Sequence, residues 1–393
     1  MASHTDSVVA VTRPGPRRNT NAHCWCKLPQ DLLRLIFERL GFADFQRAKT
    51  ICSSWLLASK ISQPNNEIPW MILIPKDNNY GLLLNPEEKD KVYKTQYLGN
   101  DFGNSFCVAT YRSWLLMLDP QCTEMNIVIS HLYILDLLTR ERINLPTFES
   151  DLGLISPVLW IDEKTKDYLV IRMHDDKNAV SFKKGDNSWK QIPELLSSGV
   201  YDCFDLLYKD HKLYCLNHYK LKIFDFSGQV PLQVFKISVR GCVHIATGLQ
   251  MRLPDIPHDL QVVKRKTNMV VTLRGDILIV ESLRPFMSKI WEFEIYKMDS
   301  SKKTKSKWDK IVSLGDESIF LDLGVTVLAK DGLEGIIKNS IYFNGNGFED
   351  KYDQNEILIY NLDTKKAEQP QQFVYSSIPL SNARWFFPSF KRE

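Results

Sequence analysis

Residues 28–60 repeat their apolar positions with the period of an α-helix. One helical face, with spacing i, i+4 and i+8, is formed by Leu32, Leu33, Ile36, Phe37 and Leu40. Pro29 stands near the start of this helix, where its missing N–H costs no hydrogen bond. Gly41 follows the last apolar position, where a left-handed cap is favoured. The pattern therefore predicts a first helix between Pro29 and Gly41.

Two more short helices are predicted directly after the first. Asp44 is expected to cap the second helix, and Ser53 or Ser54 is expected to start the third. Their apolar residues are Phe45, Ala48 and Ile51 in the second helix and Trp55 and Leu56 in the third. A unit this small is marginal unless staples or a partner stabilise it.

Beyond residues 61–70, "ISQPNNEIPW", which read as a linker, the period changes to that of β-strands. Short runs such as "WMILIPK", "KLYCLN" and "EILIYNLDT" are rich in Val, Ile, Leu, Tyr and Phe and are bounded by Gly, Asp, Asn or Pro. The remainder of the chain is therefore predicted to be a large all-β domain.

A loose repeat runs through this β-rich part. An apolar strand ends in a polar turn and meets a charged strand, as in "LYILDLLTRERINLP" and "ILIYNLDTKKAEQP". The copies have strands near residues 83, 133, 181, 223, 295 and 359. Their irregular spacing averages roughly 55 residues, close to the length of a four-stranded propeller blade. The fold class predicted is a small all-α unit of three short helices followed by a β-propeller of about six blades, with a pair of β-sandwiches as the alternative.

Charge and cysteine usage narrow the possible partners and the cellular location of the chain. The formal net charge is only +3, which gives no argument for nucleic acid as a partner, although residues 1–60 hold nine Lys/Arg against four Asp/Glu. The eight cysteines include no C-x-x-C pair, which is typical of reduced thiols inside a cell. No apolar run is long enough to cross a membrane. We expect residues 1–22 to be a disordered tail and the protein to reside in the nucleus or cytoplasm.

Catalytic and metal-binding signatures are absent from the sequence. It contains no H-E-x-x-H, G-x-S-x-G or G-x-x-x-x-G-K-[S/T] motif. Weaker candidates are His174-Asp175-Asp176, His23 with Cys24 and Cys26, and the "GNGF" of residues 345–348. Each is more simply interpreted as a turn or a solvated cluster, so we expect no catalytic residue, no metal and no cofactor.

The helical stretch resembles the F-box. The residues that carry this resemblance are "W-x-K-LP-x-DLL-x-x-IF-x-RL" followed by "R-A-K-x-I-C-x-x-W", from Trp25 to about Ser59. Residues 66–390, with "LYILDLLTRERINLP", "YKDHKLYCL", "NSIYFNG" and "ARWFFPSF", resemble the KIB-like β-propeller of plant F-box proteins. The resemblance implies an F-box unit at 23–65 and a substrate-recognition propeller at 66–393.

The resemblance also implies partners and a docking surface. An F-box docks onto the Skp-type adaptor of cullin–RING ubiquitin ligases, and the propeller would hold a target protein whose identity the sequence does not give. The expected adaptor contacts are Leu28, Pro29, Leu32, Leu33, Ile36, Leu40, Arg47, Cys52 and Trp55. For Trp55, as for Phe37 and Phe45, packing within the protein is the favoured role. A basic rim of Arg34, Arg39, Arg47 and Lys49 would face an acidic adaptor.

Three functions stay open on the sequence alone. The first is a non-catalytic specificity subunit of an SCF-type (Skp–cullin–F-box) ligase in the ubiquitin-conjugation pathway. The second is a propeller enzyme of the glycosidase or oxidoreductase type, which would need convergent carboxylates or a metal in its central channel. The third is an F-box scaffold that does not assemble a ligase. Many F-boxes carry a basic residue where this chain has Ser53, so one rim contact is expected to be weaker.

Overall fold

The computed structural model divides the chain into two compact units, residues 1–65 with 392–393 and residues 66–391, and each is described by itself. The residues that it describes are 25–40, 42–62, 68–88, 91–122, 128–149, 157–174, 178–197, 203–228, 230–239, 263–285, 290–299, 301, 307–329, 335–344, 357–369 and 379–388. The tail at 1–22, Cys24, the pair Asp175-Asp176 and "GNGF" lie outside these residues.

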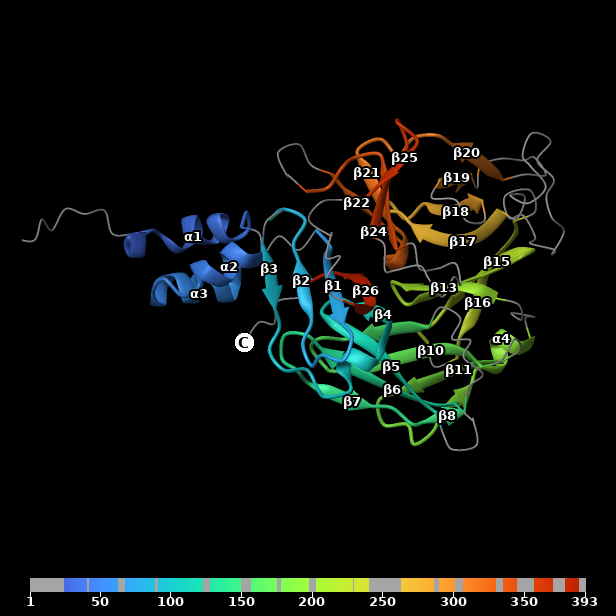
Figure 1. Cartoon of the computed structure of the whole chain (residues 1–393), viewed down its shortest axis with the longest axis horizontal. Coiled ribbons are helices and arrows are strands. Elements are labelled where there is room, and N and C mark those ends of the chain that lie inside the picture. Colours follow the sequence, from blue (N-terminus) through green and yellow to red (C-terminus); the bar gives the residue numbers. More distant parts are fainter. Residues whose placement is uncertain are drawn as a thin grey trace, which may run out of the picture. The chain divides into compact units, whose positions relative to one another are not determined.

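The first unit is helical, as the apolar period predicts (Figure 1). Its elements are η1 (Trp25–Lys27), α1 (Gln30–Phe37), α2 (Phe42–Ala48) and α3 (Ser53–Ile61). Pro29 precedes α1 with extended backbone, and its carbonyl accepts hydrogen bonds from the N–H groups of Leu32 and Leu33, both at 3.1 Å. The predicted start of the third helix at Ser53 is confirmed.

Two helix boundaries in this unit were predicted wrongly. The first helix was expected to continue through Leu40 to a cap at Gly41, which lies outside the described residues, whereas α1 ends at Phe37 with Glu38 as its C-cap. Asp44 was expected to cap the second helix from outside, whereas α2 begins two residues earlier, at Phe42. Asp44 therefore lies inside the first turn, where its carboxylate is 2.8 Å from the guanidinium of Arg47. An acidic side chain at this position interacts favourably with the helix dipole, so the residue type fits the end of the helix although it is not the cap.

The second unit is built almost entirely from strands. The first half contains β1 (Trp70–Pro75), β2 (Leu82–Leu84), β3 (Val92–Lys94), β4 (Phe106–Tyr111), β5 (Trp114–Cys122), β6 (Val128–Asp136), β7 (Arg142–Asn144), β8 (Phe148–Glu149), β9 (Val158–Ile161), β10 (Tyr168–His174), β11 (Asn178–Lys183) and β12 (Lys190–Gln191). The second half contains β13 (Cys203–Lys209), β14 (Lys212–Asn217), β15 (Lys220–Asp225), β16 (Leu232–Ser238), β17 (Val263–Val271), β18 (Ile277–Pro285), β19 (Glu292–Met298), β20 (Trp308–Ile311), β21 (Glu317–Phe320), β22 (Val325–Leu328), β23 (Ser340–Asn344), β24 (Ile357–Asn361), β25 (Lys366–Glu368) and β26 (Leu380–Phe386). Among the described residues, three short helices accompany them, η2 (Phe102–Asn104), α4 (Pro193–Ser197) and η4 (Leu321–Leu323).

These strands form sheets that succeed one another along the chain. The orders are β26-β1-β2-β3, β4-β5-β6-β7 with β8 beside β6, β9-β10-β11-β12 and β13-β14-β15-β16. The remaining strands form one nine-stranded sheet, β20-β19-β18-β17-β22-β21-β23-β24-β25. Each of the six strand positions expected from the repeat lies in a strand that stands next to the end of its sheet, namely β2, β6, β11, β15, β19 and β24.

The sheets close into a circuit. The last strand, β26, pairs with β1 from the start of the unit, with Trp70 opposite Phe386 and Met71 opposite Trp385. The inner strands neighbour one another in turn, from β26 to β4, β9, β13 and β17, and then through β22 and η4 back to β26. This closed arrangement removes the inner sheet edges, as in a β-propeller (Figure 1).

One sheet has nine strands, more than the four of a propeller blade, so sheets and blades do not correspond one to one. Its two halves, β17–β20 and β21–β25, are joined through one parallel pair, Val271 opposite Val325. The count of about six blades therefore stays a prediction.

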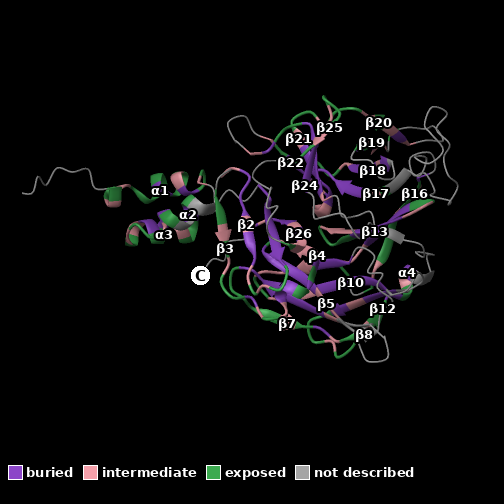
Figure 2. Cartoon of the chain, in the orientation of Figure 1, coloured by how far each residue is buried: buried purple, intermediate pink, exposed green. Residues whose placement is uncertain are grey.

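The core of the propeller lies between neighbouring sheets. One apolar cluster joins β9–β12 to β13–β16 through residues such as Ile171 and Phe224, and another joins β1, β2 and β26 to β21–β24 through Trp385, Phe320 and Tyr342. All six residues of β1 are buried (Figure 2). Strands covered on both faces need apolar residues at successive positions, which explains continuous runs such as "WMILIP".

Candidate functional site

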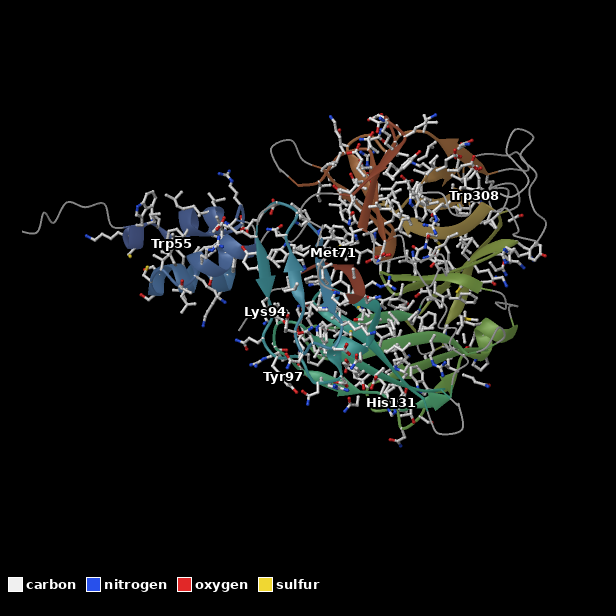
Figure 3. The ribbon with its side chains drawn as sticks, in the orientation of Figure 1. Trp55, Met71, Lys94, Tyr97, His131 and Trp308 are labelled. Atoms are coloured by element: carbon white, nitrogen blue, oxygen red, sulfur yellow. The ribbon has the colours of Figure 1, made fainter. Side chains whose placement is uncertain are left out.

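A compact aromatic centre holds the helical unit together. Phe37 of α1 packs edge-on against Phe45 of α2, with ring centroids 4.9 Å apart, and against Trp55 of α3, at 5.6 Å. The indole N–H of Trp55 donates a hydrogen bond of 3.2 Å to the carbonyl of Trp25, which ties η1 to α3 (Figure 3). The packing role favoured for Phe37, Phe45 and Trp55 is confirmed by this geometry.

The expected docking residues separate into a buried and an accessible group. Leu33 is 1% exposed and Trp55 is 8% exposed, so both belong to the centre of the unit. Leu28, Ile36, Leu40 and Cys52 are half-buried, and Pro29, Leu32 and Arg47 are exposed. The accessible group is therefore the one that a partner can reach directly, while Leu33 and Trp55 hold the helices that carry it.

The structure also exposes apolar residues that were not among the expected adaptor contacts. These are Trp25, Leu35, Ile51, Leu56, Leu57 and Ile61. Leu57 and Ile61 are four residues apart on α3 and therefore share one side of that helix. Leu35 lies off the predicted face of α1, so a single helical stripe could not identify it. Together with Leu32, these side chains give the unit an exposed apolar surface of the kind that commonly marks an interaction site.

Two of the four basic residues expected at the rim already have acidic neighbours within the unit. Arg34 lies 3.5 Å from Glu38, and Arg47 lies 2.8 Å from Asp44. For Arg39 and Lys49 the described residues show no ion pair. Exposed pairs of this kind contribute little to stability and can exchange partners readily. The rim is thus available to an acidic partner.

Cys52 has a distinctive electrostatic position at the start of α3. It occupies the N-cap position with extended backbone, although its thiol makes no cap hydrogen bond of normal geometry. The nearby backbone N–H of Trp55 and the side chain of Cys26 nevertheless hold the pKa of the Cys52 thiol below its ordinary value. The N–H groups at a helix start stabilise a thiolate, which explains the direction.

The described residues offer nothing comparable for metal chemistry. Among them, no group of three or more His, Cys, Asp and Glu side chains is placed to hold a metal ion. Within the same residues, no helix has the length and apolar character needed to cross a bilayer. The apolar surface of the helical unit is therefore the strongest candidate site.

Comparisons with known proteins agree with this architecture. Residues 25–65 match the F-box domain family, and residues 83–361 match the KIB1-4 beta-propeller family. An F-box protein from Arabidopsis thaliana is 58% identical over 97% of each chain, and a second one is 57% identical over 95% of this chain and 94% of its own. A crystal structure of a functionally unknown protein from Desulfotomaculum acetoxidans covers 81% of this chain and 99% of its own, with 8% identity and a TM-score of 0.37, which is too low to carry an argument. The chain belongs to the family of F-box proteins that carry a KIB1-4 beta-propeller.

Proposed function

We propose that this chain is the substrate-receptor subunit of an SCF-type E3 ubiquitin ligase. The unit at 23–65 would dock a Skp-type adaptor and, through it, a cullin, and the propeller at 66–393 would bind the target protein. F-box domains generally bind Skp-type adaptors. In this arrangement the chain makes and breaks no bond itself. It raises the effective concentration of the target near the ubiquitin-carrying enzyme and orients it.

One observation carries the proposal: among the described residues of the small helical unit, seven large hydrophobic side chains are exposed. Removing such surface from water is worth about 25 cal/mol for each Å². Leu28, Pro29 and Leu32 lie at the start of α1, where they are accessible, and Leu57 and Ile61 offer a second apolar side on α3. An adaptor that covers this surface would stabilise the unit and gain affinity from the same residues.

The test is the affinity of purified full-length chain for a purified Skp-type adaptor, measured by calorimetry. Leu32→Asp should weaken binding by roughly tenfold to a hundredfold, because burying a leucine is worth about 1.5–3 kcal/mol. Leu28→Ala combined with Pro29→Ala should also weaken it. Leu273→Asp is the matched control, because Leu273 of the propeller is 58% exposed and Leu32 is 48% exposed.

The outcomes separate the proposal from its alternatives. Equal affinity of the wild-type, Leu32→Asp and Leu273→Asp chains would show that the adaptor does not use this surface. Adaptor binding without transfer of ubiquitin to any protein held by the reconstituted complex would favour the scaffold function.

A further inference from the structure

One outer strand of the propeller differs from the others in length. Six strands end their sheets on the side away from the inner circuit, namely β3, β7, β12, β16, β20 and β25. Five of them have two to four residues, whereas β16 has seven. Short edge strands protect a sheet against pairing with another chain, so a long one is an exception that needs a reason.

The side chains of β16 are also unusual for a solvent-facing edge. Leu232 and Val234 are 65% and 54% exposed, and Val230 just before the strand is 55% exposed. Phe235 and Ile237, in contrast, pack against the cluster shared with β17–β20. The packing of Phe235 and Ile237 holds the strand in the propeller. The contacts of the described residues require no large apolar side chain at 232 or 234.

The backbone of β16 has hydrogen-bonding groups directed away from its sheet. The N–H of Val239 donates a hydrogen bond of 3.0 Å to the carbonyl of Tyr219, and in an antiparallel pair such bonded positions alternate with outward-facing ones. Lys236, which lies opposite Lys222, is therefore an outward-facing position. The indole of Trp308 donates to the carbonyl of Ser238 at 2.9 Å, which occupies one end of this edge (Figure 3).

A bulge limits the edge at its other side. The register shifts between Ile223 and Phe224, so that Val234 is the extra residue of β16. Bulges twist an edge strand and reduce indiscriminate pairing. Lys236 lies between the bulge and the Trp308 contact, and within the described residues β15 is the one strand that pairs with β16. The hydrogen-bonding edge at Lys236 is thus defined at both ends, and the exposed side chains of Leu232 and Val234 continue it on the bulge side.

The exposed charge beside Lys236 is basic. Lys220 and Lys236 are both exposed, whereas Lys222, which stands opposite Lys236, is buried, and Asp225 stands opposite Leu232 at the other end of β16. The sequence of β16 itself, "LQVFKIS", contains no acid. A second copy of this chain added antiparallel would bring Lys236 close to its own equivalent, which like-charge repulsion disfavours. An acidic segment would instead complement these lysines.

We propose that β16 is a target-docking strand: an extended segment of the target protein, with acidic residues beside Lys236 and branched apolar residues beside Leu232 and Val234, adds to this edge as a further strand. Main-chain hydrogen bonds would supply affinity, and the alternate side chains would supply specificity. This inference rests on the proposed function, since it names the surface by which the propeller would select a target.

The experiment is selection of random peptides of about ten residues, long enough for one strand, on the full-length chain. The enriched sequences should alternate Asp or Glu with Val, Ile or Thr. Their affinities are then measured by fluorescence anisotropy for the wild type and for Lys236→Pro and Lys236→Glu. Proline removes an outward-facing N–H without breaking the β15–β16 ladder, and glutamate reverses the charge while leaving the backbone intact.

A matched control comes from β7, another outer strand. The N–H of Leu145 donates to the carbonyl of Leu132, so Asn144, opposite Tyr133, is also an outward-facing position. Asn144→Pro should leave peptide affinity within about twofold of wild type, whereas both Lys236 variants should weaken it at least about tenfold. Circular dichroism of each variant checks that the propeller stays folded.

Three results would overturn the inference. They are enrichment of peptides without acidic residues, equal affinity for wild type and the Lys236 variants, and a concentration-dependent dimer in light scattering that Lys236→Pro abolishes. The same variants are assayed for binding to the Skp-type adaptor, which should be unchanged. If the peptide results contradict docking at β16 while the chain still binds the adaptor, this docking strand alone is rejected. If the wild-type chain does not bind the adaptor, the proposed function is rejected.

Discussion

Seven large hydrophobic side chains are exposed among the described residues between 25 and 62 of the helical unit. In the propeller, thirteen are exposed among the far more numerous described residues from 68 to 388. The propeller hides its apolar residues between neighbouring sheets, and closure through β26 covers its inner edges. In the described part of the helical unit, an aromatic centre around Phe37 packs the three helices together, while Leu32 and Leu35 of α1 and Leu57 and Ile61 of α3 stay exposed. A small unit therefore leaves apolar surface exposed, whereas a closed ring of sheets can bury its own apolar residues.

The largest loss of stability is expected from a substitution in the closing strand of the propeller. Trp385 of β26 is fully buried, with its ring centroid 4.9 Å from that of Phe320 and 5.6 Å from that of Tyr342. Trp385→Ala should lower the free energy of unfolding by about 3–5 kcal/mol, because it leaves a cavity where the ring closes. Urea unfolding followed by circular dichroism measures the change.

Trp25 of the helical unit supplies the matched control. Its side chain is 68% exposed, and its backbone carbonyl, which Trp55 uses, is retained in any variant. Trp25→Ala should therefore change the free energy of unfolding by less than about 0.5 kcal/mol. Equal losses for the two tryptophans would contradict the contrast between the units.

A second, smaller effect is expected within one turn of α1. Leu33 is buried and Leu32 is exposed, although both were expected on the same adaptor-facing side. Leu33→Ala should destabilise the helical unit by about 2–4 kcal/mol, whereas Leu32→Ala should leave its stability nearly unchanged and weaken adaptor binding instead. Hydrogen exchange of the α1 and α3 amides in the full chain measures the first quantity, and calorimetry measures the second. Similar exchange in both variants would mean that Leu33 is not a core residue.

The same two residues show what the sequence can and cannot predict about the site. The helical period places Leu32, Leu33 and Ile36 on one side of α1, whereas Leu40, which the same period includes, lies beyond the last helical residue, Phe37. Which part of that side faces Trp55 and which part faces solvent depends on how three helices pack, and a period contains no such information. For the same reason Leu35, Leu57 and Ile61 were not selected.

The same limit of sequence-based prediction applies to the strands of the propeller. Every expected repeat position lies in a strand, because buried strands require continuous apolar runs that stand out in the sequence. The repeat predicts the strand near residue 223, which is β15, but it predicts no position in β16, which begins at Leu232. A run such as "LQVFKIS" has the same composition whether its strand is central or at an edge, so only the pairing reveals that Leu232 and Val234 are exposed.

The smallest perturbation is chemical labelling of the cysteines, whose main measurement is made on the wild type. The pKa of the half-buried Cys52 thiol is lowered chiefly by the Trp55 backbone N–H, whereas burial raises the pKa of Cys107 in β4 to about 12. Alkylation proceeds through the thiolate. A lowered pKa means that Cys52 reaches half of its maximal rate at a lower pH than an ordinary cysteine, and Cys107 stays protonated throughout the range from about pH 6 to pH 9.

Iodoacetamide labelling over this pH range, followed by mass spectrometry of the peptides, should therefore show early modification of Cys52 and almost none of Cys107. Cys26→Ala should move the Cys52 profile to higher pH, because it removes the side-chain hydrogen bond that is the second cause of the lowered pKa. Bound adaptor should slow the labelling of Cys52 if this residue belongs to the docking surface. Labelling of Cys52 that follows the profile of a free thiol and is indifferent to the adaptor would place the start of α3 outside the interface and leave the apolar residues of α1 as its centre.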